Sequence, residues 1–508
     1  MVRAFRIGAA ASVLALTASL VGTAAAQTST AYTTRFATAI TYQNVGTGTA
    51  NLQLDLYPEG SGSPTTITGL PQLTLAPGAG TSLAMGAISS LASGFKGAGI
   101  LSSDEPVVAT MVQLPIGSLV KNRPLSNGFS PDEGAAKFLI ATTLKAAFES
   151  TTQFSVQNID SVGADLTIQF FDATSTPPGT LVTAATQTVT NLPAGSAKYF
   201  DLGTITTLPN GFNGSAIITS KKTGTATDGR VVATALELST TGLSASSFEG
   251  VAGGANTVYM PAALCQAFTP SQTSIYAIQN VENAGGAVAS VTVTYKYRPA
   301  ISPTAAIQTL TTPAVSIAPG GKSSFNACLN GLPAGSTGSA TITSTGGKIV
   351  GIAKVQGGGF STAAPGAIAG AAKLAFPYVR TTIAFFDTVA AGETSTRQRT
   401  SIAIQNVGAA TIPAGALSVK YIDRNGAQVG STFTNSAALP SGEKFNSNPT
   451  NAGAAANEFG AYGGGAFGGS ALVECTAPGC TIVGVARVAT RVNAVIVGAE
   501  DYNGIPVN

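Results

Sequence analysis

The chain contains no histidine and no tryptophan among its 508 residues. Without histidine, the Ser-His-Asp and Cys-His catalytic arrangements, histidine-ligated zinc and the commonest general base near neutral pH are all excluded. Without tryptophan, a frequent aromatic platform for sugars is missing, although 12 tyrosines and 22 phenylalanines remain. These two absences argue against an enzyme and make a carbohydrate-binding module less favoured.

Charge is also scarce, because Asp, Glu, Lys and Arg make up 10% of the residues, against about 25% in an average soluble protein. The net charge of +3 predicts no binding of nucleic acid and no electrostatic binding of membranes. The acids that are adjacent in sequence are Asp104-Glu105, Asp132-Glu133 and Glu500-Asp501. Neighbours in a strand point to opposite faces, so none of these pairs builds a catalytic site. We therefore expect no enzyme, and the low charge tolerates self-association.

Long apolar runs are confined to the N-terminus, where residues 1–26 have the pattern of a signal peptide. Arg3 and Arg6 precede the apolar stretch Ile7–Val21, and Ala24-Ala25-Ala26 forms a small-residue cleavage site. The alternative is an uncleaved anchor, for which the apolar stretch is short. The sequence therefore predicts export through a cleaved signal peptide to an extracellular or cell-surface location, without a membrane span.

The four cysteines are even in number, as expected for disulfides in an exported chain. Cys475 and Cys480 flank a turn sequence and can staple a hairpin end, while Cys265 and Cys328 fall in one repeat. The alternative is a zinc site built from all four thiolates, for which the spacing is poor.

A long internal repeat is the most informative feature that is present. Alternating apolar runs end in Gln-Asn at steps of 114, 122 and 126 residues: Gln43-Asn44, Gln157-Asn158, Gln279-Asn280 and Gln405-Asn406. A glycine-rich alternating segment follows each pair by 54 to 64 residues. A repeat of this length is the size of one autonomous β-sandwich.

The second repeat shows the pattern of about seven short strands with turn signals between them. Phe154 and Val156 share one face of an alternating run, and residues 165–170 alternate again. We predict an all-β chain of four tandem Ig-like antiparallel β-sandwich domains after the signal peptide. The predicted divisions are 1–26, 27–135, 136–255, 256–371 and 372–508. Because the connections are short, we expect a semi-rigid string of modules.

The repeated asparagines are predicted to be structural turn residues: Asn44, Asn158, Asn280 and Asn406. An asparagine side chain bonds the backbone of the turn that it begins. A repeated ligand site at the Gln-Asn pairs is the less favoured alternative. We expect no cofactor, because no D-x-[DN]-x-[DN]-G calcium loop is present, although Ca²⁺ between modules stays open. Residues 463–468 match G-x-G-x-x-G but precede a strand, which does not fit a dinucleotide site.

The first module is predicted to be incomplete. In the first repeat, the strand that precedes the Gln-Asn run would begin near residue 23, inside the signal peptide. An open sheet edge of this kind accepts a strand from another chain. Two alternatives are that residues 34–39 supply the missing strand, or that the module has six strands.

The repeat resembles the tandem Ig-like β-sandwich modules of bacterial cell-surface proteins. The resemblance covers nearly the whole mature chain and rests on the Gln-Asn runs and on glycine-rich strands such as 214–217 and 338–341. It implies a secreted, non-enzymatic structural protein that self-associates into a surface layer, sheath or filament, or that forms a stalk. The alternative is a monomeric adhesin or glycan-binding array. Expected partners are other copies or other cell-surface components, with no nucleic acid.

Overall fold

The chain folds almost entirely into β-strands. The computed structural model describes residues 35–116, 120, 122–175, 178–239, 241, 244–299, 305–381, 396–453, 468–492 and 495–507. Within these ranges there are 36 strands, six short 3-10 helices and no α-helix, so the predicted all-β class is confirmed. No helix in the described ranges is long and apolar enough to cross a membrane. The predicted signal peptide and residues 463–467 of the glycine-rich loop lie outside these ranges.

The strands form four modules of two antiparallel sheets each. The first module contains β1 (Arg35–Asn44), β2 (Ala50–Pro58), β3 (Thr65–Ile67), η1 (Pro71–Leu73), β4 (Thr74–Leu75), β5 (Gly80–Ala84), η2 (Met85–Ala87), β6 (Gly97–Ser103), β7 (Val107–Ile116) and β8 (Leu125–Asn127). After η3 (Pro131–Glu133), the second contains β9 (Lys137–Lys145), β10 (Ser150–Asn158), β11 (Ala164–Asp172), β12 (Thr180–Leu181), η4 (Thr183–Ala185), β13 (Gln187–Leu192), β14 (Ala197–Asp201), η5 (Leu202–Thr204), β15 (Phe212–Lys222), β16 (Val231–Ser239), β17 (Ala245–Glu249) and β18 (Val251–Ala252).

The other two modules repeat this order. The third contains β19 (Thr257–Cys265), β20 (Thr273–Asn280), β21 (Ala289–Arg298), β22 (Gln308–Thr311), β23 (Val315–Ile317), β24 (Lys322–Asn326), β25 (Ser336–Gly346), β26 (Ile349–Gly357) and β27 (Phe360–Pro365). The fourth contains β28 (Lys373–Val379), β29 (Thr396–Asn406), β30 (Leu417–Asp423), β31 (Gln428–Thr434), β32 (Lys444–Ser447), η6 (Pro449–Ala452), β33 (Gly469–Cys475), β34 (Ile482–Val492), β35 (Val495–Asn503) and β36 (Ile505–Pro506).

Alternating side chains build the core of each module. In β21, every second residue from Ala289 onward is buried, including Val291, Val293 and Tyr295, and the residues between them are only partly buried. A strand with this pattern presents one face to a partner sheet and leaves the other face polar. One face of each sheet therefore packs inside its own module.

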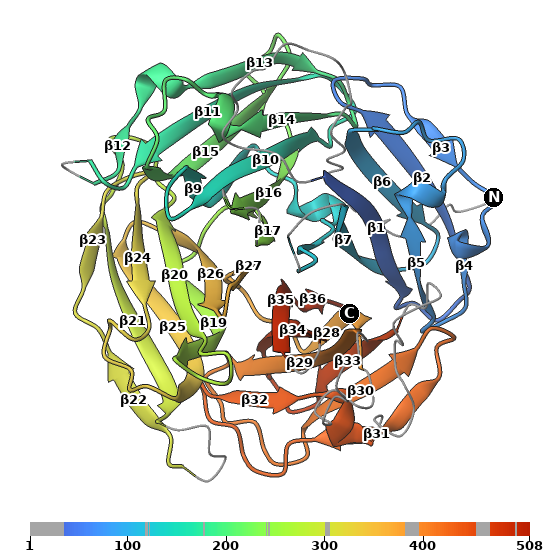
Figure 1. Cartoon of the computed structure of the whole chain (residues 1–508), viewed down its shortest axis with the longest axis vertical. Coiled ribbons are helices and arrows are strands. Elements are labelled where there is room, and N and C mark those ends of the chain that lie inside the picture. The colour runs from blue at the N-terminus through green and yellow to red at the C-terminus, as the bar shows by residue number, and fades with distance from the viewer. Residues whose placement is uncertain are drawn as a thin grey trace.

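One sheet of each module runs inward to the centre of the molecule and is called here the hub sheet. The hub sheets have the strand orders β5-β1-β7-β8, β14-β10-β16-β17, β24-β20-β26-β27 and β32-β29-β34-β35. Their last strands, β8, β17, β27 and β35, contact one another in turn around the centre. Figure 1 shows the result, a ring in which the first module lies beside the fourth.

The expected string of modules is therefore wrong, and the modules close on themselves. The side chain of Asn127 donates to the carbonyl of Asn503 at 2.8 Å, which joins the first module to the fourth. Apolar packing also crosses the junctions, because Val112 and Leu125 of the first module belong to the core of the fourth. A string would leave these apolar surfaces in water, so burial favours closure.

The first module is the irregular one. In the other modules, β15, β25 and β33 each pair with the strand that begins the module, namely β9, β19 or β28. Among the described residues, β6 pairs with β2 alone. Residues 35–39 do not supply the missing strand, because they belong to β1 and pair with β7 in the hub sheet. The hydroxyl of Tyr199 in the second module donates to the carbonyl of Gly97 in β6 at 2.5 Å.

Candidate functional site

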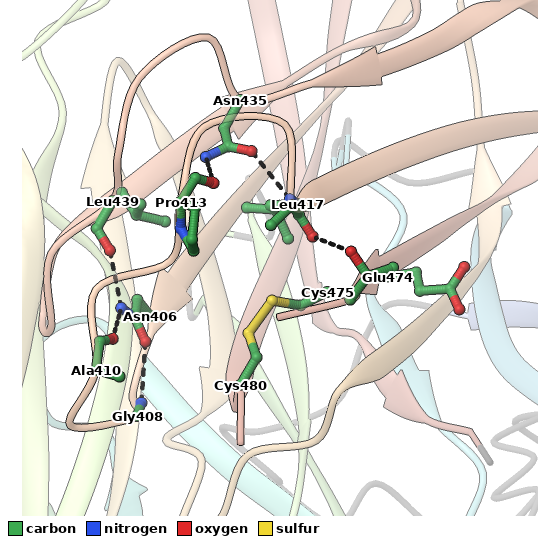
Figure 2. Close-up of a disulfide and its surroundings, with 12 residues drawn as sticks. Asn406, Gly408, Ala410, Pro413, Leu417, Asn435, Leu439, Glu474, Cys475 and Cys480 are labelled. Atoms are coloured by element: carbon green, nitrogen blue, oxygen red, sulfur yellow. Dashed lines mark hydrogen bonds between the residues drawn. A yellow bond between two sulfur atoms is a disulfide. The ribbon is translucent and has the colours of Figure 1, made fainter. Parts of the chain in front are cut away.

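The repeated asparagines bond the backbone of the turns that follow them. In the fourth module, Asn406 Nδ2 donates to the carbonyls of Ala410 at 2.8 Å and Leu439 at 2.9 Å, and its Oδ1 accepts from the Gly408 N–H at 3.0 Å (Figure 2). The side chains of the other three make the same kind of contacts, with two carbonyls and the N–H two residues on: Asn44, Asn158 and Asn280. These side chains are fully used inside the fold and are not free to bind a ligand.

Two of the glutamines that precede them, Gln279 and Gln405, lie at junctions between modules. Gln279 Nε2 donates at 3.2 Å both to Gly320 in its own module and to the carbonyl of Ala216 in the second module. Gln405 Nε2 does the same at 3.3 Å with Gly442 and with Ala340 of the third module. In the third and fourth modules the Gln-Asn pair therefore closes a turn with one residue and contacts the preceding module with the other. Gln43 and Gln157 donate to carbonyls of their own modules.

All four cysteines form disulfides, as predicted. Cys265 and Cys328 join the first strand of the third module to the segment after β24. Cys475 and Cys480 span the turn after β33 (Figure 2). A zinc site built from the four thiolates is excluded by this pairing. No cluster of three or more potential metal-ligating His, Cys, Asp or Glu side chains occurs in the described ranges.

The outer edge of the ring carries one class of candidate functional surface. Four strands at the periphery, called here the rim strands, each pair on one side only within the described ranges: β3, β13, β22 and β31. None of them contains a charged residue, and their exposed positions are mostly Thr, Gln, Ser and Gly. An edge strand without charge or proline is a template for pairing with another strand. Figure 1 shows these strands on the outside of the ring.

A cavity that opens to the surface lies between the second and third modules and is called here the junction cavity. Its volume is about 510 Å³, within the range of about 300–1,000 Å³ typical of small-molecule sites. Hydroxyl groups dominate its polar lining: Thr142, Ser150, Ser239, Thr241, Ser244, Ser246, Ser324 and Ser361. Phe148 and Phe360 supply aromatic surface.

Three charged side chains lie buried in the wall of the junction cavity. Lys354 Nζ donates to both carboxylate oxygens of Glu237, at 2.8 and 2.7 Å, across the junction. Lys322 is 5% exposed, and its Nζ donates to Thr142 Oγ1 at 3.2 Å. No carboxylate forms an ion pair with Lys322 among the described residues. The buried part of the wall therefore holds two potential cations and one anion.

Burial brings the pKa of Lys322 into the neutral range. It lowers the pKa of the Lys322 ammonium to about 7, and the nearby positive charge of Lys354 acts in the same direction. Glu237 acts in the opposite direction, because a nearby negative charge favours the ammonium. A negatively charged ligand beside Lys322 would likewise raise its pKa.

A strained turn forms part of the mouth of the cavity. Ala146, Phe148 and Glu149 all have positive φ, at 51°, 48° and 56°, a region that residues other than glycine rarely adopt. Phe148 is 76% exposed. The corresponding turn in the third module also places residues at positive φ, including the exposed Phe268, so these two modules share the strained turn. In the second module it holds an aromatic ring and a carboxylate at the mouth of the cavity.

A second cavity, of about 460 Å³, lies at one end of the hub. Its lining is largely apolar and includes the carboxylates of Glu249, Glu133 and Asp132. Burial raises the pKa of Glu249 to about 7, and its carboxylate accepts the N–H of Asn127. Glu249 and Asn127 occupy equivalent hub positions, each followed by a glycine.

The adjacent carboxylates of β35 diverge, as expected for neighbours in a strand. Glu500 accepts the backbone N–H of Arg123 in the first module. Asp501 binds Arg487 through both oxygens, at 2.7 and 2.5 Å, and accepts from Thr362 of the third module at 2.7 Å. They therefore support two different junctions.

The junction cavity is not apparent from the repeat pattern. Glu237 and Lys354 are 117 residues apart, and no spacing rule joins them. One signal was present, since each is the one charged residue of a mostly apolar strand in a chain poor in charge. Such a charge is rarely buried without a partner.

Comparison with known proteins gives no family. No family model matches the chain, and no curated protein matches it. Among solved structures, a red sea bream transglutaminase is 9% identical over 49% of this chain and 31% of its own, with a TM-score of 0.10. The α-L-rhamnosidase of Streptomyces avermitilis, solved with L-rhamnose, is 9% identical over 87% of this chain and 54% of its own, also with a TM-score of 0.10. This chain thus matches only part of the length of either protein, and at these scores neither likeness carries an argument about fold or function.

Proposed function

We propose that this chain is an exported, non-enzymatic structural protein of the cell surface that self-associates into a layer, sheath or filament. The observation that carries the proposal is the uncharged, one-sided rim strand in each of the four modules. Strands at an exposed edge usually carry a charge, a proline or a covering element that prevents pairing with other chains. The rim strands carry no charge and no proline.

The closed ring adds a geometric reason to expect assembly through the rim strands. Hub strands lie at the centre, and rim strands face outward (Figure 1), so further copies are added at the periphery. Strand pairing between copies supplies main-chain hydrogen bonds in a fixed direction. The two disulfides support an oxidising location outside the cytoplasm.

Strand completion at β6 is a second route to assembly, and it has less support. Its edge lies at the junction with the second module, where Tyr199 already donates to Gly97 and packs with Ala98. A donated strand would have to displace this contact.

The test introduces charge into the rim strands of the chain from Gln27 onward. The variant carries Thr188→Lys, Thr309→Lys and Thr432→Lys, all at exposed rim positions. Negative-stain electron microscopy and sedimentation of the parent are expected to show ordered fibres or sheets. The variant is expected to stay dispersed, because lysines on an edge oppose strand pairing.

A matched control places three lysines in exposed loops instead: Ser63→Lys, Thr227→Lys and Ser441→Lys. It adds the same charge and is expected to assemble as the parent does. Dispersed parent protein at high concentration would overturn the proposal and favour a monomeric adhesin or glycan-binding array. Equal loss of assembly in both variants would show that net charge, and not the rim strands, controls it.

A further inference from the structure

The junction cavity combines features that fit a ligand of one chemical class. Its buried wall holds two lysines and one glutamate, and the ammonium of Lys322 donates only to Thr142 among the described residues. An ammonium has three donors, so Lys322 has donor capacity beyond its contact with Thr142. A carboxylate satisfies such a cation away from water through charge-assisted hydrogen bonds.

The rest of the lining indicates what must surround that carboxylate. Hydroxyls from β16, β17, β24 and β27 face the space, among them Ser239, Ser246, Ser324 and Ser361. Hydroxyl groups both donate and accept, so they suit a ligand with several hydroxyls of its own. Phe148 and Phe360 offer apolar surface for the carbon face of a ring.

Charge also sets the direction in which the ligand enters. The ionisable groups of the lining are Lys322, Lys354 and Glu237 in the buried wall and Glu149 at the exposed mouth. Lys354 and Glu237 neutralise each other through two hydrogen bonds. A ligand carboxylate is therefore attracted inward by Lys322 and repelled by Glu149 at the mouth, whose oxygens accept hydrogen bonds from ligand hydroxyls.

We propose that the junction cavity binds a small polyhydroxylated carboxylate, of the uronic-acid class, with the carboxylate at Nζ of Lys322. The ligand spans the second and third modules, because Lys322 and Lys354 come from the third while Thr142, Glu237 and the mouth turn come from the second. This site is independent of the rim strands, so it does not depend on self-association.

Binding is expected to weaken as pH rises. The carboxylate interacts with the protonated form of Lys322, whose pKa burial lowers to about 7 in the free protein. Above this pH the free protein must take up a proton to bind, and the affinity falls with each further pH unit. The same protein at acid pH therefore serves as an internal reference.

The experiment titrates the chain from Gln27 onward with D-glucuronate, D-glucose and N-acetyl-L-glutamate by calorimetry at about pH 6 and about pH 9. Glucuronate is expected to bind at the lower pH at least about tenfold more tightly than at the higher. Glucose, which lacks the carboxylate, and N-acetylglutamate, which lacks the hydroxyls, are each expected to bind at least about tenfold more weakly than glucuronate. Equal binding of either probe would overturn the assignment of ligand class.

Two variants test the site itself. Lys322→Met removes the cation. Ser324→Phe fills the cavity from an exposed position of β24, so this second variant is expected to fold even if Lys322→Met does not. Each is expected to reduce glucuronate binding at least about tenfold. The matched control is Lys444→Met, because Lys444 pairs with Gln405 in the fourth module as Lys322 pairs with Gln279 in the third. Undetectable binding of glucuronate, or unchanged binding in Ser324→Phe, would overturn the proposal.

Discussion

Buried ionisable side chains are the residues most sensitive to solution conditions in this protein. Glu249 lies buried at the hub, accepts a hydrogen bond from Asn127, and has Glu133 close enough to raise its pKa further. Lys322 lies in the junction cavity and shifts in the opposite direction. Desolvation disfavours the charged form of both groups. The pKa of the glutamic acid therefore rises and the pKa of the lysine falls, each to about 7.

Replacing Glu249 with glutamine should make stability less dependent on pH. The pKa of the carboxyl is about 4.3 when the chain is unfolded and about 7 when it is folded. Between these values the folded state binds a proton that the unfolded state has lost, so the free energy of unfolding falls as pH rises. Glu249→Gln cannot ionise and keeps an acceptor for Asn127. Urea unfolding should show it equal to the parent near pH 4 and more stable by about 3 kcal/mol near pH 8.

The pH series contains its own control, since both proteins are measured near pH 4, where the parent carboxyl is neutral. If the two proteins differ by the same amount at every pH, burial does not hold the proton on Glu249. A glutamine variant that is less stable near pH 8 would contradict the assignment directly.

Local turns connect the strands of this fold, and two disulfides that close loops of very different length link some of them covalently. The Cys265–Cys328 disulfide has a sequence separation of 63 residues, and Cys475–Cys480 a separation of 5. Closing a longer loop removes more entropy from the unfolded chain. The same bond therefore has unequal effects in the third and fourth modules.

Removal of each disulfide should show this difference. The chain-entropy relation predicts that Cys265→Ser with Cys328→Ser destabilises the third module by about 4 kcal/mol. It predicts about 2 kcal/mol for Cys475→Ser with Cys480→Ser in the fourth. Thermal unfolding of the two double variants without reductant measures the order. Each serves as the control for the other, and a larger loss from the short loop would contradict the entropic account.

Contacts between the first and last modules close the ring of the whole molecule. Gly498 of β35 lies against Asn122, and a Cβ at this position would meet the Asn122 Cβ at 2.9 Å and its Cα at 3.0 Å. Backbone atoms at these distances cannot make room without moving the module. A side chain at this position would therefore push the first module away from the fourth.

Gly498→Val is expected to open the junction between the first and fourth modules. Overpacking of this kind costs about 1–3 kcal/mol, and an opened ring is less compact, so the radius of gyration from small-angle scattering should rise. The control is Gly86→Val, because a Cβ at Gly86 meets nothing within 4 Å. An unchanged radius of gyration and melting temperature in Gly498→Val would show that the ring does not depend on this contact.

Local order in this protein follows from its sequence. Alternation of apolar residues predicts strands, because successive side chains point to opposite faces. The repeated asparagines precede turns, since their side chains reach the backbone two to seven residues on. The disulfides follow from the even number of cysteines and their spacing. These features all depend on residues near one another in the chain or on a simple count.

Only the tertiary structure decided the ring, the hub and the junction cavity. Nothing in the sequence places Asn127 beside Asn503 or Glu237 beside Lys354, because the partners are separated by 376 and 117 residues. The expected string of modules was wrong for this reason, since linker length limits how far modules separate but not whether their faces meet. Apolar and hydrogen-bonding surfaces at the module faces closed the ring. Packing of the second module against the third brought the buried lysines and glutamate around one cavity.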